Sequence, residues 1–174
     1  MPTTPITLTH LNACPAGEFV TAVGPIFEHS PWIAAAAVSG RPFASRDALH
    51  AAMCDVVRAA GEERQLALIR AHPDLVGREV RRHEARLTAE SSREQAAAGL
   101  TDLAPDDIAR FDRYNTAYKA RFGFPFVICA RQNKKEAILR AFPERLTHTR
   151  DQEIAEALRQ IFEIARLRLE DLVA

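Results

Sequence analysis

Apolar residues recur along most of the chain at alternating spacings of three and four, the period of an amphipathic α-helix. Proline, glycine and serine separate these stretches. The first stretch, residues 19–27, is interrupted at Gly24-Pro25, and turns are predicted at residues 30–32 and 41–43. The pattern predicts an all-α fold built from many helices.

The central part of the chain predicts two helices in succession. Ser45 is a suitable N-cap for a helix that runs to about Gly61. A second helix runs from Glu62 to about Ala71 and ends at His72-Pro73. The buried face of the first helix is predicted to consist of Leu49, Ala52, Met53, Val56, Val57 and Ala60.

The C-terminal half predicts three more helices. Pro105 suits the first position of one helix, and Asn133 with Glu136 predicts a cap for another at residues 134–142. The last helix is expected from about residue 150 to 172. The apolar face of the first of these contains Ile108, Phe111, Asn115, Tyr118 and Phe122. A polar Asn115 on this face indicates either a buried hydrogen-bonding strut or a residue near a ligand.

Residues 122–130 do not follow the helical pattern. Their aromatic and β-branched content is typical of a buried strand, but no partner strand is evident. We therefore expect an extended or irregular buried segment. Its backbone polar groups need hydrogen-bond partners, which a bound polar ligand can supply.

Length and composition favour one globular domain spanning residues 1–174, with 47% hydrophobic and 26% charged residues. The formal net charge is zero, which argues against nucleic acid or an anionic membrane as the main partner and leaves room for a local basic pocket. No apolar run approaches the about 18 residues of a membrane span. Met1-Pro2-Thr3-Thr4 does not begin a secretory signal, so we expect a cytoplasmic protein.

The three cysteines, Cys14, Cys54 and Cys129, form no CxxC pair. Their spacing predicts neither a zinc site nor a disulfide framework, but free and largely buried thiols. Cys129 lies in an apolar run and is expected to pack as a small hydrophobic residue. A thiol nucleophile is the alternative, which no histidine pattern supports.

His72 is the first candidate for catalysis. It precedes a proline, so its backbone is directed out of the α region and the imidazole is presented at a corner of the chain. No HxxxH or similar ligand spacing is recognised, and we expect no metal site. The other histidines, which lack such a context, are His10, His29, His50, His83 and His148.

Glu94 is the second candidate and has a structural explanation. Ser91-x-x-Glu94 matches a capping box, in which both side chains satisfy amides at a helix start. A catalytic role is compatible with capping, since a helix N-terminus also attracts anions. Gln95 has no capping role, which slightly weakens the purely structural explanation.

Arg168 is the third candidate, singled out by helical periodicity. It falls on the apolar face of the last helix, whereas Arg159 and Arg166 fall on the opposite, solvated face. A buried guanidinium needs an anionic partner because an unpaired buried charge is very costly. The partner is either an internal carboxylate or the carboxylate of a substrate.

Taken together, several of these segments resemble the OHCU decarboxylase family, and the resemblance covers nearly the whole chain. Each segment alone is weak evidence for the family, but their occurrence in this order along the chain is highly specific for it. The segments are Phe27-Glu28-His29-Ser30-Pro31-Trp32, Arg41-Pro42-Phe43, His72-Pro73-Asp74-Leu75, Leu87-Thr88-Ala89-Glu90-Ser91-Ser92-Arg93-Glu94-Gln95, Arg121-Phe122-Gly123-Phe124-Pro125-Phe126-Val127-Ile128 and Ala165-Arg166-Leu167-Arg168-Leu169.

The resemblance implies an all-helical enzyme, commonly a homodimer, that uses neither metal nor organic cofactor. It implies conversion of 2-oxo-4-hydroxy-4-carboxy-5-ureidoimidazoline (OHCU) to (S)-allantoin in urate breakdown. His72 would be the principal catalytic residue, with Glu94 and Arg168 completing the polar site. The residues expected to line the substrate pocket are Pro73, Ser91, Gln95, Phe126, Val127, Ile128, Cys129 and Ala130.

A non-catalytic helical interaction module is the competing hypothesis. In that case His72-Pro73 merely ends a helix and Ser91 with Glu94 merely caps one. An enclosed polar pocket that joins His72, Glu94 and Arg168 would favour the enzyme.

Overall fold

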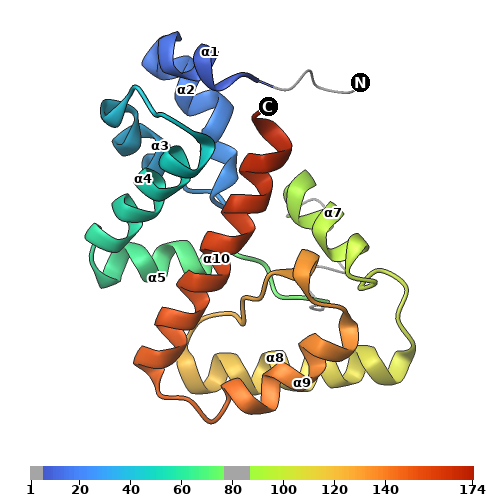
Figure 1. Ribbon diagram of the computed structural model, residues 1–174. Helices are drawn as coiled ribbons and strands as arrows, with labels where there is room; N and C mark the ends of the chain where they lie inside the picture. Colours follow the sequence, from blue (N-terminus) through green and yellow to red (C-terminus); the bar gives the residue numbers. More distant parts are fainter. Residues whose placement is uncertain (1–5, 77–86) are drawn as a thin grey trace. The chain divides into compact units, whose positions relative to one another are not determined.

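The computed structural model describes residues 6–76 and 87–174 (Figure 1). Within these ranges the chain is all-α, as predicted, and only an isolated parallel bridge between Ile6 and Val173 resembles β-structure. The expectations for residues 1–4 and for His83 lie outside the described residues. The chain divides into two compact units, Met1–Ala71 with Phe162–Ala174 (unit 1) and His72–Ile161 (unit 2). Each unit is described by itself, and the single domain stays a prediction.

Unit 1 contains the first helices and the end of the last one. Its elements are α1 (Leu8–Ala13), α2 (Ala16–Val23), the 3₁₀ turn η1 (Gly24–Ile26), α3 (Trp32–Ala37), the 3₁₀ turn η2 (Val38–Gly40), α4 (Arg46–Ala59), α5 (Glu62–Arg70) and residues 162–172 of α10 (Arg150–Leu172). The interruption predicted at Gly24-Pro25 is the 3₁₀ turn. Ser45 caps α4 as predicted, because its hydroxyl accepts a hydrogen bond from the Ala48 amide at 3.0 Å.

The core of unit 1 forms where α3 packs on α2 and α4. Arg41 holds the end of α1 from the side, because its guanidinium donates to the Leu11 and Cys14 carbonyls at 3.0 and 2.6 Å. Such carbonyls have no partner within a helix and need one from elsewhere. The fully buried side chains of this core include Leu11, Phe19, Val23, Ile33, Leu49, Val57, Leu68 and Ile69.

Unit 2 contains α7 (Ala89–Ala97), α8 (Pro105–Phe122), the 3₁₀ turn η4 (Ala130–Gln132), α9 (Lys135–Arg145) and residues 150–161 of α10. Pro105 occupies a first-turn position of α8, as predicted. Gly123 ends α8 in the left-handed conformation with φ 78°, which glycine adopts without steric cost.

An aromatic cluster fills the centre of unit 2. The ring of Tyr118 contacts those of Phe122, Phe124 and Phe126, and Phe126 stacks on Phe142 with centroids 3.8 Å apart. Residues 124–129 are neither helix nor strand, and all are buried. This confirms the prediction of an irregular buried segment after α8.

The predicted capping box at Ser91 is wrong. Helix α7 begins at Ala89, and Thr88 is its N-cap, because the Thr88 hydroxyl accepts a hydrogen bond from the Ser91 amide at 3.2 Å. Ser91 is therefore inside the first turn, and Glu94 lies in the second turn, where no cap is needed. Threonine and serine are both favourable N-cap residues, and the predicted N-cap, Ser91, lies three residues after the actual one, Thr88.

The cap predicted at Asn133 is also wrong. The N-cap of α9 is Lys134, which makes no side-chain capping bond. Asn133 instead donates from Nδ2 to the carbonyl of Cys129, four residues earlier, at 2.9 Å. Helix α9 also continues through Pro143 to Arg145, beyond the predicted end at Phe142.

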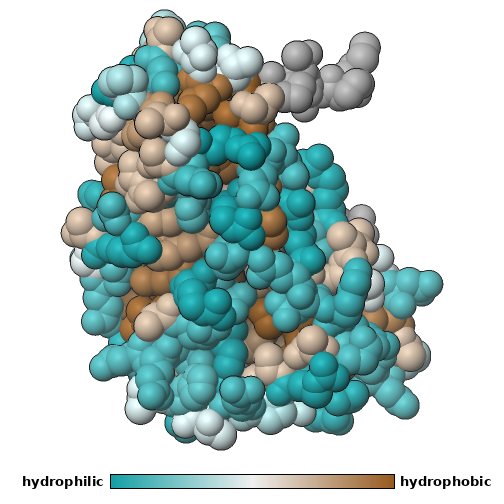
Figure 2. Space-filling model, in the orientation of Figure 1, coloured by the Kyte–Doolittle hydropathy of each residue, from teal (hydrophilic) through white to brown (hydrophobic). Residues whose placement is uncertain are grey.

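Across residues 6–76 and 87–174, no helix combines the length and apolar character that a membrane span requires. Hydrophilic residues cover much of the face drawn in Figure 2, with hydrophobic residues between them.

Candidate active site

His72 lies two residues after the end of helix α5. Helix α5 ends at Arg70 with Ala71 as its C-cap, which confirms the predicted break before Pro73. The imidazole residue is nevertheless buried, with 7% of its surface exposed. A buried histidine on irregular backbone makes no contribution to a helical packing face. This placement is compatible with a role in a site, and the catalytic role stays a prediction.

Helix α8 holds the turn that follows His72. Asn115 donates from Nδ2 to the carbonyl of Leu75 at 2.8 Å, and this bond is buried. One turn later on the same helix, Lys119 Nζ lies 2.5 Å from a carboxylate oxygen of Asp74. The turn is thereby attached to a rigid element at two points, which limits the positions that His72 can take.

Helix α7 contacts the same turn through its buried face. Gln95 accepts a hydrogen bond from the Val76 amide at 3.4 Å. Val76 has a φ of 57°, a left-handed conformation that is rare for a β-branched residue and costs about 1–3 kcal/mol. Ser91 and Gln95 are one turn apart and both buried, so two predicted substrate-binding residues share one face of α7.

Asn115 is a buried strut, as one of its two interpretations expected, with 4% of its surface exposed. The Leu75 carbonyl can only accept a hydrogen bond, so the amide atom of Asn115 that faces it is the nitrogen, Nδ2, and not the oxygen. Its Oδ1 is buried and has no hydrogen-bond partner in the described part of the chain. An unsatisfied buried acceptor costs about 1–3 kcal/mol, so a ligand N–H at this oxygen would be favourable. The second interpretation, a residue near the ligand, therefore stays open.

Glu94 is not a capping residue in this arrangement. It lies in the second turn of α7 and is half-buried, and the helix start is already capped by Thr88. Neither capping nor the favourable field of a helix N-terminus, which acts within the first turn, accounts for a carboxylate here. The structure thus excludes helix capping as an explanation for Glu94.

The predicted substrate-binding residues Phe126, Val127, Ile128, Cys129 and Ala130, which we call the central segment, are all buried in unit 2. Side chains of two helices bind its backbone. Gln160 accepts from the Cys129 amide at 2.8 Å, and Arg145 donates to the Val127 carbonyl at 2.6 Å. Part of the polar backbone that a ligand was expected to satisfy is thus satisfied by the protein.

A buried charged cluster supports Arg145 in turn. Glu153 is completely buried and accepts hydrogen bonds from Arg145 Nε at 3.0 Å and from the Tyr118 hydroxyl. His148 Nδ1 lies 2.8 Å from the other carboxylate oxygen. Burial and the hydrogen bond to Glu153 raise the pKa of Tyr118 above its usual range, so the phenol stays protonated and donates.

The sequence analysis did not identify this cluster. Glu153 lies four and eight residues before the buried Ala157 and Ile161, so the periodicity that singled out Arg168 applies to it as well. Glu153 lies in the first turn of α10, where an acidic residue is expected because of the helix dipole. Its place on the buried face was therefore not taken as a sign of a buried ion pair.

Arg168 is buried in unit 1, as periodicity predicted, with 6% of its surface exposed. Its Nη1 lies 3.0 Å from a carboxylate oxygen of Glu28, which is 1% exposed, and 3.4 Å from the Ile26 carbonyl oxygen. The internal salt bridge left open by the sequence therefore exists. Arg166 is half-buried and pairs with two glutamates of its own helix, as expected for a residue on the other face.

The predicted site residues fall in both units. His72, Pro73, Glu94 and the central segment belong to unit 2, together with Ser91 and Gln95, whereas Arg168 belongs to unit 1. Within unit 2, the Gln95 contact joins α7 to the turn after His72. The gathering of His72, Glu94 and Arg168 in one pocket stays a prediction.

The cysteines fit the expectation of free, buried thiols. All three are free and buried, and Cys129 is completely so. Burial raises the pKa of the Cys54 thiol to about 12, which keeps it protonated and unreactive near neutral pH.

The family profile described as OHCU decarboxylase matches residues 12–170. A protein of Amia calva named 2-oxo-4-hydroxy-4-carboxy-5-ureidoimidazoline decarboxylase is 44% identical over 95% of this chain and 94% of its own length. A protein of the same name from Haloferax volcanii is 42% identical over 94% of both chains. A uric acid degradation bifunctional protein of Bacillus subtilis is 38% identical over 96% of this chain and 33% of its own length.

Two solved structures are similar to this chain. A crystal structure of (S)-allantoin synthase superposes with a TM-score of 0.75 at 29% identity, covering 97% of this chain. This chain spans about half of that protein, 54% of its length. A crystal structure of OHCU decarboxylase in the presence of (S)-allantoin has a TM-score of 0.66 at 21% identity, covering 89% of this chain and 96% of that one, and supports the fold.

The buried cluster around Glu153 predicts a large effect on stability. Replacing Glu153 with Gln leaves the Arg145 guanidinium buried without a counter-charge, and we expect a loss of about 3–5 kcal/mol in the free energy of unfolding. Urea denaturation followed by circular dichroism measures it. Glu170→Gln is the matched control on the same helix, because its ion pair with Arg166 is partly exposed to solvent and such pairs are worth about 0–1 kcal/mol. Equal losses in the two variants would contradict the prediction.

Proposed function

Since this chain belongs to the OHCU decarboxylase family, we propose that it is a carboxy-lyase that converts OHCU to (S)-allantoin in urate degradation. The observation that carries the proposal is the family match over residues 12–170, together with relatives of that name over nearly the full length of both chains. The competing interaction module is not favoured, because it gives no reason for such a match.

The chemistry of the substrate sets what the protein must do. The OHCU carboxylate is attached to a carbon next to a ring C=N bond. When the bond to the carboxylate breaks and CO₂ leaves, the electron pair forms a C=C bond to the imine carbon, and the imine nitrogen takes up a proton. The hydroxyl then loses its proton to become the ring carbonyl while a proton is added to the former imine carbon, the stereocentre of allantoin. The substrate therefore contains its own electron sink, and the reaction needs neither a metal nor an organic cofactor. The protein orients the substrate, stabilises the electron-rich intermediate and delivers a proton to one face.

His72 and Glu94 are the proposed acid–base pair. They handle the proton on the hydroxyl and ring positions of the substrate, and groups so placed contribute roughly 10²–10⁴-fold each. The attachment of the turn after His72 to α8 supports this role, because proton transfer requires a donor in a fixed position. For Glu94, support comes from its position in the second turn of α7, where capping does not require it.

Arg168 is proposed to bind a substrate carbonyl or developing negative charge. A tight salt bridge to the departing carboxylate would stabilise the ground state and slow the reaction. The ion pair with Glu28 supports the weaker role, because Glu28 already balances the guanidinium charge. Arg168 then acts as an oriented hydrogen-bond donor rather than as a clamp on the carboxylate.

The central segment is proposed to recognise the ureido and ring carbonyls through its backbone amides. Gln160 and Arg145 support this role by fixing the backbone around Cys129 and Val127. Ser91, Gln95 and Pro73 complete the proposed lining. The family resemblance further supports a homodimer that acts on this small-molecule substrate. The free, buried cysteines support a cytoplasmic location.

A stereochemical assay tests the function directly. Freshly generated OHCU is added to the purified protein, and the optical activity of the allantoin formed is followed by circular dichroism. We expect (S)-allantoin to form well above the spontaneous rate. Racemic allantoin at the spontaneous rate would refute the enzymatic function, whatever the fate of individual residues.

Substitution of the acid–base pair tests the mechanism. His72→Asn and Glu94→Gln should each lower the rate by at least about 10²-fold while the helical circular dichroism is retained. His10→Asn, at an exposed histidine, and Glu90→Gln, one turn before Glu94 on α7, are the matched controls and should keep full activity. A folded and fully active His72→Asn protein would remove the proposed mechanism.

A double variant separates the structural role of Arg168 from its catalytic one. Arg168→Met removes the guanidinium that lies 3.0 Å from the buried carboxylate of Glu28, so we expect a loss of about 3–5 kcal/mol in the free energy of unfolding. Adding Glu28→Gln removes that charge and should restore part of the stability. If Arg168 binds substrate, the stabilised double variant still has little activity. Recovery of activity along with stability would show that Arg168 serves only the salt bridge.

A further inference from the structure

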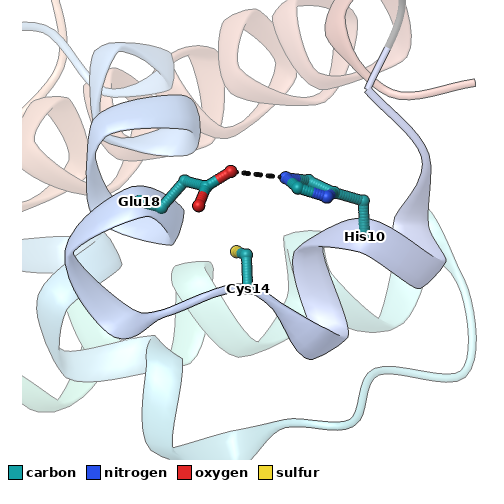
Figure 3. Close-up of side chains that lie close together, drawn as sticks. All are labelled: His10, Cys14 and Glu18. Carbon is teal, nitrogen blue, oxygen red and sulfur yellow. Dashed lines mark hydrogen bonds and ion pairs between the residues drawn. The ribbon is translucent and has the colours of Figure 1, made fainter.

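Three side chains of metal-ligating type come together where the first two helices of unit 1 meet. His10 lies in α1, Cys14 is the C-cap of α1, and Glu18 lies in the first turn of α2. Figure 3 shows the imidazole and the carboxylate facing each other, with the sulfur beside the line that joins them. One ligand atom from each residue lies within 4.8 Å of the other two. This site was not predicted from the sequence, because its residues form neither a histidine pair nor a CxxC pair.

The donor set suits a zinc ion in both chemistry and size. Imidazole nitrogen, thiolate sulfur and carboxylate oxygen are the three ligand types that Zn²⁺ takes from proteins, with bonds of about 2.0–2.3 Å. Tetrahedral geometry then places the ligand atoms about 3.3–3.6 Å apart. His10 Nε2 and Glu18 Oε1 are 2.7 Å apart and must separate slightly. Both side chains are about half exposed, 52% and 51%, so they have room to do so.

The backbone that presents these ligands is held in place. The Thr7 hydroxyl accepts from the His10 amide, and the Cys14 amide donates to the His10 carbonyl at 2.8 Å. Arg41 fixes the carbonyl of Cys14 at 2.6 Å and that of Leu11 at 3.0 Å. The backbone of Cys14 therefore has a defined position before any ion arrives, and the thiol itself donates to the Leu11 carbonyl at 3.6 Å. A fixed backbone lowers the cost of forming the site.

We propose that His10, Cys14 and Glu18 form a zinc site in which water is the fourth ligand. On binding, the Cys14 thiol releases its proton to solvent, the neutral imidazole binds through Nε2, and the ion replaces the direct contact between His10 and Glu18. The site connects α1 to α2 and stabilises the start of the chain. The proposal is independent of the decarboxylation, which uses the imine of the substrate.

Zinc alone is the probe for the test. The full-length protein is stripped with a chelator and titrated with Zn²⁺ in competition with a chromophoric chelator. We expect one equivalent of Zn²⁺ to bind and the thermal midpoint Tm to rise with added Zn²⁺. Cys14→Ser and Glu18→Gln should each weaken binding more than about 100-fold, since even groups outside the ligand set are worth 10–100-fold. With Co²⁺ in place of Zn²⁺, the sulfur-to-metal charge-transfer absorption should vanish in Cys14→Ser.

The chain contains a matched control pair. His50 and Cys54 in α4 have the same spacing as His10 and Cys14, and their ring nitrogen and sulfur are 3.4 Å apart. His50 Nε2 lies 2.8 Å from the Phe162 carbonyl oxygen, so this nitrogen is occupied, and burial raises the pKa of the Cys54 thiol to about 12. Cys54→Ser should therefore keep zinc binding, the Tm rise and the cobalt spectrum.

Three outcomes would overturn the proposal. They are the absence of stoichiometric Zn²⁺ binding to the wild-type protein, binding that survives in Cys14→Ser, and binding lost equally in Cys54→Ser. If Cys14→Ser fails to fold, Glu18→Gln decides, because its exposed side chain can be changed without disturbing the core. Binding retained in a folded Glu18→Gln protein would leave only a surface ion pair between His10 and Glu18.

Discussion

Buried backbone outside a helix must find hydrogen-bond partners, and this constraint shapes both parts of the candidate site in unit 2. Leu75 and Val76 in the turn after His72 are irregular and buried, and so are residues 126–129 of the central segment, Phe126–Ala130. Neither can satisfy its amides and carbonyls by its own regular structure. The helices supply the missing partners through side chains, Asn115 and Gln95 for the turn and Arg145 and Gln160 for the segment. The same bonds that make burial tolerable also fix the backbone where a substrate is proposed to bind.

Charged side chains used in this way must themselves be neutralised. Arg145 can hold the Val127 carbonyl in the core because Glu153 balances its charge and is hydrogen-bonded by Tyr118. Unit 1 uses the same arrangement, in which the buried Arg168 is balanced by Glu28. A buried ion pair is weak support for stability, since an apolar replacement of both partners can be as stable. What such a pair provides is a guanidinium with a fixed direction.

Periodicity predicted the parts of the molecule that depend on helix faces alone. The all-α fold, the extent of α4, α8 and α10, and the burial of Arg168 follow from spacings of three and four, and the irregular buried segment followed from the loss of that spacing. The errors lie where tertiary contacts choose between equal local options. Thr88 and Ser91 are both suitable N-caps, and Ser91 is on the face of α7 that is buried. At Asn133 the competing option is local, because its side chain donates to the carbonyl of Cys129, four residues earlier.

Side-chain networks could not be predicted from the sequence, because they join helices and segments that lie far apart along the chain. Tyr118 and Glu153 are 35 residues apart, and Asn115 and Leu75 are 40 apart, so no spacing rule connects either pair. For a reaction whose electron sink is in the substrate, catalysis depends on position more than on unusual chemistry in the side chains. The residues that decide position are then those that anchor backbone, and these are the residues that a search for catalytic types passes over. A site of this kind is therefore recognised from its sequence by its catalytic residues, whereas its precision depends on residues that only the structure reveals.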